Sequence, residues 1–390
     1  MESNEQRVPR NVKMLGLVSL LTDASSEMVY PVLPLFLANV LHTPVAAIGL
    51  IESVAETTAS VAKVFSGWLS DRLGKRKPLV VLGYSLSNLM KPLLAIVPSW
   101  PSVLLLRWAD RLGKGVRTAP RDALIADSST PERRGRDFGV HRALDTVGAA
   151  IGPLTAWAIL TWSPGAYRTV FLVSAIPGTI AIFVVLAMVR EARGAARPEM
   201  ARPAFRLRHL GRPFALFTAA SALFALGNSS DAMLILRAQD LGAKPALVPL
   251  MYFVFNVVAA ALATPFGVLS DRVGRKRILA TGFAGYALVY AGFALAHGTA
   301  SPWVLFALYG IPYAMTEGLA RAYVVDLVPA SARATAVGGY TFALGLAALP
   351  ASTGAGLLWD GVSHSAPFAV SAGLMLAAAV WLALQPSARA

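Results

Sequence analysis

The chain has 390 residues, of which 56% are hydrophobic and only 14% are charged. A water-soluble protein of this length carries about 25% charged residues because its surface must be hydrated, so much of this surface faces hydrocarbon. The absence of cysteine excludes disulfides, thiol catalysis and cysteine-ligated metals. The five histidines form no pair four residues apart, so we expect neither a metal site nor a cofactor.

Apolar runs of about 20 residues, long enough to span a bilayer as helix, alternate with short basic bursts along the chain. They predict an all-α integral membrane protein. The expected spans are 14–40, 45–70, 78–98, 101–126, 138–161, 166–189, 213–238, 246–270, 278–297, 301–326, 335–358 and 365–385.

The net charge of +14 resides mainly in those bursts, so it predicts contact with membrane lipids and not with nucleic acid. Basic residues gather at the N-terminal tail, after spans two, four and eight, and between spans six and seven. The positive-inside rule then places both termini in the cytoplasm. The tail Met1 to Lys13 lacks the apolar core of a signal peptide. We expect a bacterial-type inner membrane location.

The segment between spans six and seven is too polar to enter lipid, since 190–212 carries seven arginines. It predicts a cytoplasmic linker between an N-terminal six-helix bundle at 1–189 and a C-terminal six-helix bundle at 213–390. An internal repeat supports two related halves: Gly67-Trp-Leu-Ser-Asp-Arg-Leu-Gly-Lys-Arg-Lys77 recurs as Gly267-Val-Leu-Ser-Asp-Arg-Val-Gly-Arg-Lys-Arg277. Paired halves are how many transporters build a site at their interface.

The repeated loop resembles the signature loop of the major facilitator superfamily, which lies between helices two and three and again between helices eight and nine. The resemblance covers nearly the whole chain and implies twelve helices in two pseudo-symmetric bundles. It implies a conformational gate motif, in which the glycines let helix ends approach and the aspartates latch the gate. The residues concerned are Gly67, Asp71, Arg72, Gly74, Gly267, Asp271, Arg272 and Gly274.

Two further elements resemble those of proton-coupled exporters in the family. Span five carries Gly148, Gly152 and Pro153, similar to the exporters' glycine-proline motif, although Leu154-Thr155-Ala156 replaces the usual glycine pair and leaves the antiport direction open. Span one contains Pro31 and Pro34, which remove backbone hydrogen bonds and predict a kink.

Charged side chains inside the spans are costly and need a reason. On span four, basic and acidic residues from Arg107 to Arg121 recur at spacings of three and four, which places them on one helical face. That face must line a cavity or pair with acids on neighbouring spans. The candidates for proton coupling or substrate contact in the N-terminal half are Asp23, Glu27, Glu56, Arg111, Arg117, Arg142 and Asp145, with Arg111 and Arg117 as basic counterparts of the acids.

The C-terminal half is poorer in charge and richer in aromatics, from which we single out Tyr252, Asn256 and Tyr313 as cavity candidates. A cavity charged on one side and aromatic on the other suits an amphipathic solute. Each of these aromatics also fits ordinary helix packing, so that interpretation stays open.

These features predict a secondary active transporter and not an enzyme, with a small-molecule substrate and protons as partners and a monomer as the unit. Proton-coupled export of a drug-like compound or metabolite is the leading interpretation. The alternative is a proton-coupled symporter or carrier of an organic anion or siderophore-like chelate. A primary pump lacks a nucleotide-binding motif here, and a passive channel explains the intramembrane charges less well.

Overall fold

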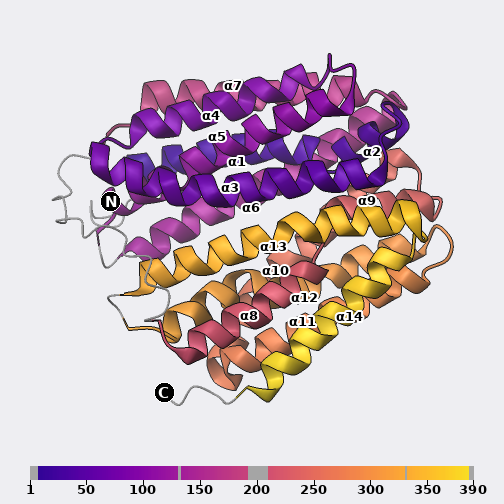
Figure 1. Cartoon of the computed structure of the whole chain (residues 1–390). Coiled ribbons are helices and arrows are strands. Elements are labelled where there is room, and N and C mark those ends of the chain that lie inside the picture. Colours follow the sequence, from indigo (N-terminus) through magenta and orange to yellow (C-terminus); the bar gives the residue numbers. More distant parts are fainter. Residues whose placement is uncertain (1–7, 131–132, 192–209, 330–331, 386–390) are drawn as a thin grey trace. The chain divides into compact units, whose positions relative to one another are not determined.

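The computed structural model describes residues 8–130, 133–191, 210–329 and 332–385, and within them the chain is all-helical (Figure 1). Most of the predicted linker, 192–209, lies outside the described residues. The helices form two compact units, one containing 1–33 with 58–200 and the other containing 34–57 with 201–390. The first half of the chain therefore does not form one unit by itself, because Pro34 to Thr57 packs with the second.

The first half of the chain supplies seven helices within the described residues. They are α1 (Arg10–Val29), α2 (Leu33–Asn39), α3 (Val45–Leu73), α4 (Lys77–Leu93), α5 (Trp100–Asp127), α6 (Arg134–Trp162) and α7 (Tyr167–Met188). The predicted spans one to six coincide with these elements to within a few residues. Span one is broken between α1 and α2 at Tyr30-Pro31-Val32, where the prolines predicted a kink.

The second half repeats this plan. Its elements are α8 (Arg212–Gly227), α9 (Asp231–Asp240), the short 3₁₀ helix η4 (Pro245–Leu247), α10 (Val248–Val273), α11 (Arg275–Leu295), α12 (Ser301–Asp326), α13 (Arg333–Gly361) and α14 (Ala366–Leu384). The predicted span 213–238 corresponds to one stretch, Arg212–Asp240, that is long and apolar enough to cross a membrane, and within it Asn228 to Ser230 separate α8 from α9. Ser230 caps α9, its hydroxyl accepting a hydrogen bond from the amide of Ala232 at 3.3 Å.

Corresponding helices pack against each other in the same pairs in the two units. In the first, α1 packs against α6 and α7, and α4 packs against α5 and α7; in the second, α8 packs against α13 and α14, and α11 packs against α12 and α14. Eight helices in the described part of the chain are long and apolar enough to cross a membrane by length and composition alone. The helix α5 is not among these eight because one of its faces is polar, and α4 is not among them because it has only 17 residues.

Pro34 to Thr57 makes several polar contacts within the second unit. The side-chain amides of Asn39 on α2 and Gln239 on α9 donate to each other, at 3.0 and 2.6 Å. Asp360 of α13 accepts hydrogen bonds from the first two backbone amides of α3, at 3.2 and 2.8 Å. Thr57 donates to the carbonyl of Gly345 at 2.7 Å. The helix α3 consequently begins in one unit and ends in the other.

Candidate functional site

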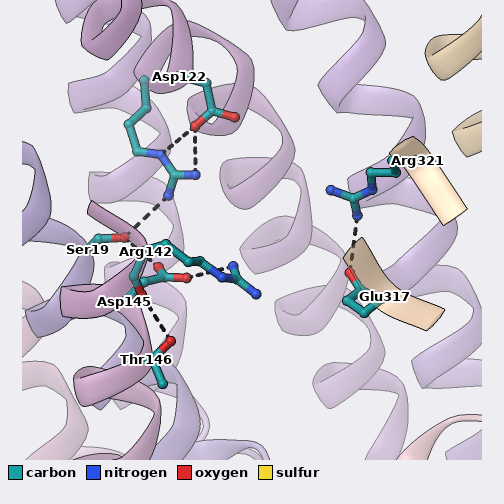
Figure 2. A network of polar contacts seen from close by, with 8 residues as sticks. Ser19, Asp122, Arg142, Asp145, Thr146, Glu317 and Arg321 are labelled. Carbon is teal, nitrogen blue, oxygen red and sulfur yellow. Dashed lines mark hydrogen bonds and ion pairs between the residues drawn. The ribbon is translucent and has the colours of Figure 1, made fainter. Parts of the chain in front are cut away.

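A polar cluster lies where α1, α5 and α6 meet in the first unit. Asp145 of α6 accepts a hydrogen bond from the hydroxyl of Ser19 at 2.7 Å and forms an ion pair with Arg142, whose side chain is exposed, at 2.9 Å (Figure 2). Arg121 of α5 donates to the same Ser19 hydroxyl at 3.4 Å. Asp23 of α1 lies close enough to Asp145 for the two carboxyl groups to interact. We call these five residues the Asp23–Asp145 cluster.

Two neighbouring carboxyl groups disfavour double ionisation, as in acid pairs that share one proton. Ser19 and Arg142 both donate to Asp145, so of the two acids Asp145 has the contacts that stabilise a carboxylate.

Two glycines of the motif predicted in span five, which is α6, bring this cluster together. A Cβ atom on Gly148 would lie 2.2 Å from the carbonyl oxygen of Leu20, and one on Gly152 would lie 2.7 Å from that of Ala24. Both contacts are with the backbone of α1, which cannot move aside cheaply. The glycines therefore let α6 approach α1 closely enough for Asp145 to reach Ser19. Pro153 follows Gly152 inside α6 and is buried.

A small pocket lies one turn further along α1. Its lining includes Ser26, Glu27 and Tyr30 of α1, Lys91 of α4, and Arg107, Asp110 and Arg111 of α5. Asp110 is held from two sides, because Ser87 donates to one oxygen and Arg107 pairs with the other at 3.2 Å. The guanidinium of Arg111 lies 5.9 Å from the centre of the Tyr30 ring. This cluster we call the Lys91 pocket.

Arg117 occupies a different environment from the one that the sequence predicts. Its side chain is buried, with its guanidinium carbon 4.3 Å from the centre of the Tyr84 ring, a cation–π contact. Two of its nitrogens have no hydrogen-bond partner within the described residues. The guanidinium groups of the Asp23–Asp145 cluster belong to Arg121 and Arg142, whereas Asp23 acts on Arg117 electrostatically.

The second unit is organised around Asp231 at the start of α9. Tyr309 donates to one carboxylate oxygen at 2.8 Å, and Tyr252 donates to the other at 3.5 Å. Glu52 and Glu56 of α3 are among the charged groups that act on Asp231 electrostatically. Glu56, predicted as a candidate among the acids of the N-terminal half, lies in the segment that packs with the second unit.

The other C-terminal candidates lie beside this acid. Tyr313 packs edge-on against Phe255, with ring centres 5.1 Å apart, and Phe255 also contacts Tyr252 and Tyr309. The side-chain nitrogen of Asn256 is buried and has no partner within the described residues. The structure therefore brings Tyr252 and Tyr313 into one aromatic group, with Asn256 next to Phe255 in the sequence of α10.

The repeated loops form related ion pairs. Arg76 lies 2.7 Å from Asp127 and 4.0 Å from Asp71 in the first copy. In the second, Arg275 lies 2.6 Å from Asp326 and 3.3 Å from Asp271. The paired residues Arg76 and Asp127 are displaced by 199 from Arg275 and Asp326, whereas the motif aspartates are displaced by 200. The first residue after Gly274 starts α11, whereas two residues separate Gly74 from α4.

The glycines of the repeated loops differ in backbone conformation and in how closely other atoms approach them. Gly74 and Gly274 have positive φ angles of 61° and 100°, which favour glycine. No atom of the described residues lies within 4 Å of a Cβ added to Gly267, and at Gly67 only an ordinary contact is found. The expected close approach of helix ends at these two positions is not present. Of the motif arginines, Arg72 lies over the ring of Trp68 at 5.4 Å, whereas Arg272 is exposed in the last turn of α10.

Sequence reasoning missed three residues of these sites. Lys91 is a lone lysine in the last turn of span three, and its burial could have been suspected from the apolar residues before it. Asp231 is the acidic residue that follows Ser229 and Ser230, in the repeat of Ser25-Ser26-Glu27. Ser19 carries no signal, because a single serine in a membrane helix is common.

The chain belongs to the Major Facilitator Superfamily, whose family model matches residues 15–236 and 216–390. It is therefore an integral membrane protein with multiple spans, and a transporter and not an enzyme. The twelve-helix fold predicted from the repeated loops is confirmed. A variant of the nucleoside transporter NupG has a crystal structure that superimposes with a TM-score of 0.82 at 14% identity, covering 95% of this chain and 98% of that chain.

Two relatives show similarity in sequence. The chain is 38% identical over 364 residues to the uncharacterized MFS-type transporter MJ1317 of Methanocaldococcus jannaschii, covering 91% of this chain and 90% of the relative. It is 28% identical over 284 residues to the multidrug resistance protein MdtG of Escherichia coli, covering 70% and 69%. The family thus gives the class of protein, a transporter of small molecules.

Proposed function

We propose that the protein is a proton-coupled secondary transporter that exports a small organic solute across the cytoplasmic membrane. The observation that supports this most is the proximity of Asp23 on α1 to Asp145 on α6, because two neighbouring acids can share one proton. Arg121 and Arg142 lie on neighbouring elements and favour the ionised form of the pair. A rearrangement that changes these contacts loads or releases the proton.

Export is favoured by the similarity to MdtG, a multidrug resistance protein. The close contact of α6 with α1 at Gly148 and Gly152, residues predicted from a motif of exporters, agrees with it. In this proposal both termini and the basic loops lie in the cytoplasm, and the ion pairs of Arg76 and Arg275 act as conformational latches. The transport unit is a monomer surrounded by lipid.

Uptake by symport is the second candidate. It is favoured by the buried arginines of α5, since Arg107, Arg111 and Arg117 are each no more than 5% exposed and suit an anionic solute such as an organic acid or a chelate. The two candidates differ in the sign of the coupled proton movement. An exporter of the antiport type takes up protons as it releases solute, whereas a symporter carries both in one direction.

The test is proton movement in proteoliposomes that contain an internal pH dye, with a panel of organic anions and lipophilic cations. Wild type is compared with Asp145→Asn and Asp23→Asn. We expect solute-dependent proton flux in wild type and its loss in both variants. Glu317→Gln is the matched control, because Glu317 is an acid on α12 that pairs with Arg321 at 3.3 Å (Figure 2) and has no carboxyl partner.

Solute movement without proton flux in wild type would overturn the coupling. Unchanged flux in Asp145→Asn and Asp23→Asn would overturn the assignment of the proton to this pair. Equal loss in Glu317→Gln would show that any intramembrane acid is required, and would remove the special role of the cluster.

A further inference from the structure

Two titratable side chains are buried on α6 between its first residue and the Asp23–Asp145 cluster. Asp137 is 1% exposed and His141 is 5% exposed. They are the first two buried residues of α6, and the next two are Gly148 and Gly152. A helix normally buries apolar side chains on the face that packs against its neighbours. A carboxyl group and an imidazole take that place here, which needs an explanation.

Each of these two side chains has a buried atom without a hydrogen-bond partner in the part of the chain that the structure describes. The atoms are Oδ2 of Asp137 and Nε2 of His141. Almost every buried polar atom in a folded protein is hydrogen-bonded, because leaving one unpaired costs free energy. Two such atoms on successive turns of one helix therefore lower its stability, which favours a role in function over a role in packing.

Asp137, His141 and Asp145 follow one another along α6 at intervals of four residues. Side chains at this interval lie on one face of a helix, with their Cβ atoms about 5–6 Å apart. Each side chain leans toward the N-terminal end of its helix, and the ion pair of Asp145 with Arg142, three residues earlier, has this direction. The three titratable groups therefore form a line that leads from the Asp23–Asp145 cluster toward the first residue of α6.

The charged groups that act on the imidazole come from two helices. Asp145 and Arg142 belong to α6 itself, and Arg121 and Asp122 belong to α5. Two are acidic and two are basic, so together they do not fix the ring in one charge state. A neutral imidazole has one nitrogen that accepts a proton and one that donates. Burial disfavours the charged ring, so a proton taken up by His141 is passed on and not stored.

We propose that His141 and Asp137 conduct protons between the Asp23–Asp145 cluster and the end of α6 at which Arg134 lies. The inference rests on the proposed proton coupling and adds the route to the cytoplasmic side. A proton on the carboxyl group of Asp145 passes to the free ring nitrogen of His141, directly or across one water molecule, which leaves a carboxylate and an imidazolium. The imidazolium gives the proton of its other nitrogen to the carboxylate of Asp137 and becomes neutral again. Asp137 lies in the first turn of α6 and releases the proton to water, and the reverse steps load the pair.

The rate at which the pair takes up a proton tests this route. A light-triggered release of protons from a caged acid lowers the pH around the purified protein in detergent, and time-resolved infrared absorption follows the protonated carboxyl group. The band of the pair is assigned by its loss in Asp23→Asn or Asp145→Asn. Neither a solute nor a gradient is used. A band that persists in both variants would overturn the proposal, because the pair would not be the destination of the proton.

His141→Gln keeps a polar side chain that cannot pass a proton on. It is expected to slow the uptake by about 100-fold, the lower end of the contribution of a positioned proton-transfer group. The final intensity of the band should not change, because the pair and its contacts remain. Asp137→Asn should also slow the uptake, and it does not depend on the folding of His141→Gln. His297→Gln, at an exposed loop histidine, is the control and should match wild type.

Chemical rescue of His141→Ala gives a readout that a structural role would not move. Added imidazole should restore the fast uptake, whereas pyrazole, a ring of the same size that is a much weaker base, should not. Equal rescue by both would overturn the proposal. So would an unchanged rate in His141→Gln and Asp137→Asn, or a changed final intensity at an unchanged rate. Because no solute is present, failure here leaves the test of solute-dependent proton flux intact, and failure of that flux leaves this test intact.

Discussion

Replacing Gly148 by alanine is expected to separate α1 from α6. The new Cβ would lie 2.2 Å from the carbonyl oxygen of Leu20 and 2.9 Å from its carbonyl carbon and Cα. Relief of this overlap requires the helices to move apart by roughly 1 Å, since packed carbon and oxygen atoms rarely approach below about 3.4 Å. Overpacking of this kind costs about 1–3 kcal/mol, and the higher helix propensity of alanine offsets about 0.5–1 kcal/mol.

The net loss of up to about 2.5 kcal/mol corresponds to an unfolding midpoint lower by up to about 5–10 °C for a unit of this size. The same movement stretches the 2.7 Å bond between Ser19 and Asp145 beyond hydrogen-bond range. We therefore expect Gly148→Ala to lose proton coupling together with thermal stability.

Gly373→Ala on α14 is the matched control, because no atom of the described residues lies within 4 Å of its added Cβ. Alanine there should raise the unfolding midpoint slightly or leave it unchanged. Both melts are recorded in the same detergent, and proton flux is measured in parallel. A midpoint for Gly148→Ala equal to or above that of wild type would refute the reasoning that backbone contact sets the distance between α1 and α6.

Two further predictions concern polar contacts. The side chains of Arg76 and Asp127 are 18% and 17% exposed. A double-mutant cycle on this pair, measured by thermal melts, should give a coupling energy of about 1–2 kcal/mol, above that of a surface pair. A coupling energy near zero would contradict a structural latch. Tyr309→Phe should destabilise the protein by about 1–3 kcal/mol, whereas Tyr252→Phe should cost less, because their bonds to Asp231 are 2.8 and 3.5 Å. Equal unfolding midpoints for these two variants would contradict that ranking.

Much of the fold could be predicted from the sequence because the bilayer imposes a length on each helix. Apolar runs bounded by charged or proline-containing loops located the spans to within a few residues. The break between α8 and α9 was missed, although Asn228-Ser229-Ser230 interrupts the apolar run with three polar residues that compete for backbone hydrogen bonds. Length and hydropathy do not register such a local competition.

The candidate sites could be predicted only in part, since spacing places residues on a face of one helix but does not choose the neighbouring helix. The polar face of α5 followed from its spacing of three and four, and Asp145 lies near Arg142 as expected. That the segment of Glu56 packs with the second unit could not be predicted, because the partner of a helix depends on tertiary packing. Lys91 was missed because one lysine near the end of a span resembles a membrane anchor.

The segment Pro34 to Thr57 has a mechanical consequence. Side-chain amides, hydroxyls and the carboxylate of Asp360 contribute to its attachment in the second unit, and each such bond has a net worth of about 0.5–1.5 kcal/mol. These polar bonds are contacts in which two exchanging conformations a few kcal/mol apart can differ. Because α3 is one uninterrupted helix, release of its first residues is transmitted as a rigid rod to its other end. Backbone amides at the start of α3 should therefore exchange with deuterium faster than those in its centre whenever the transporter cycles.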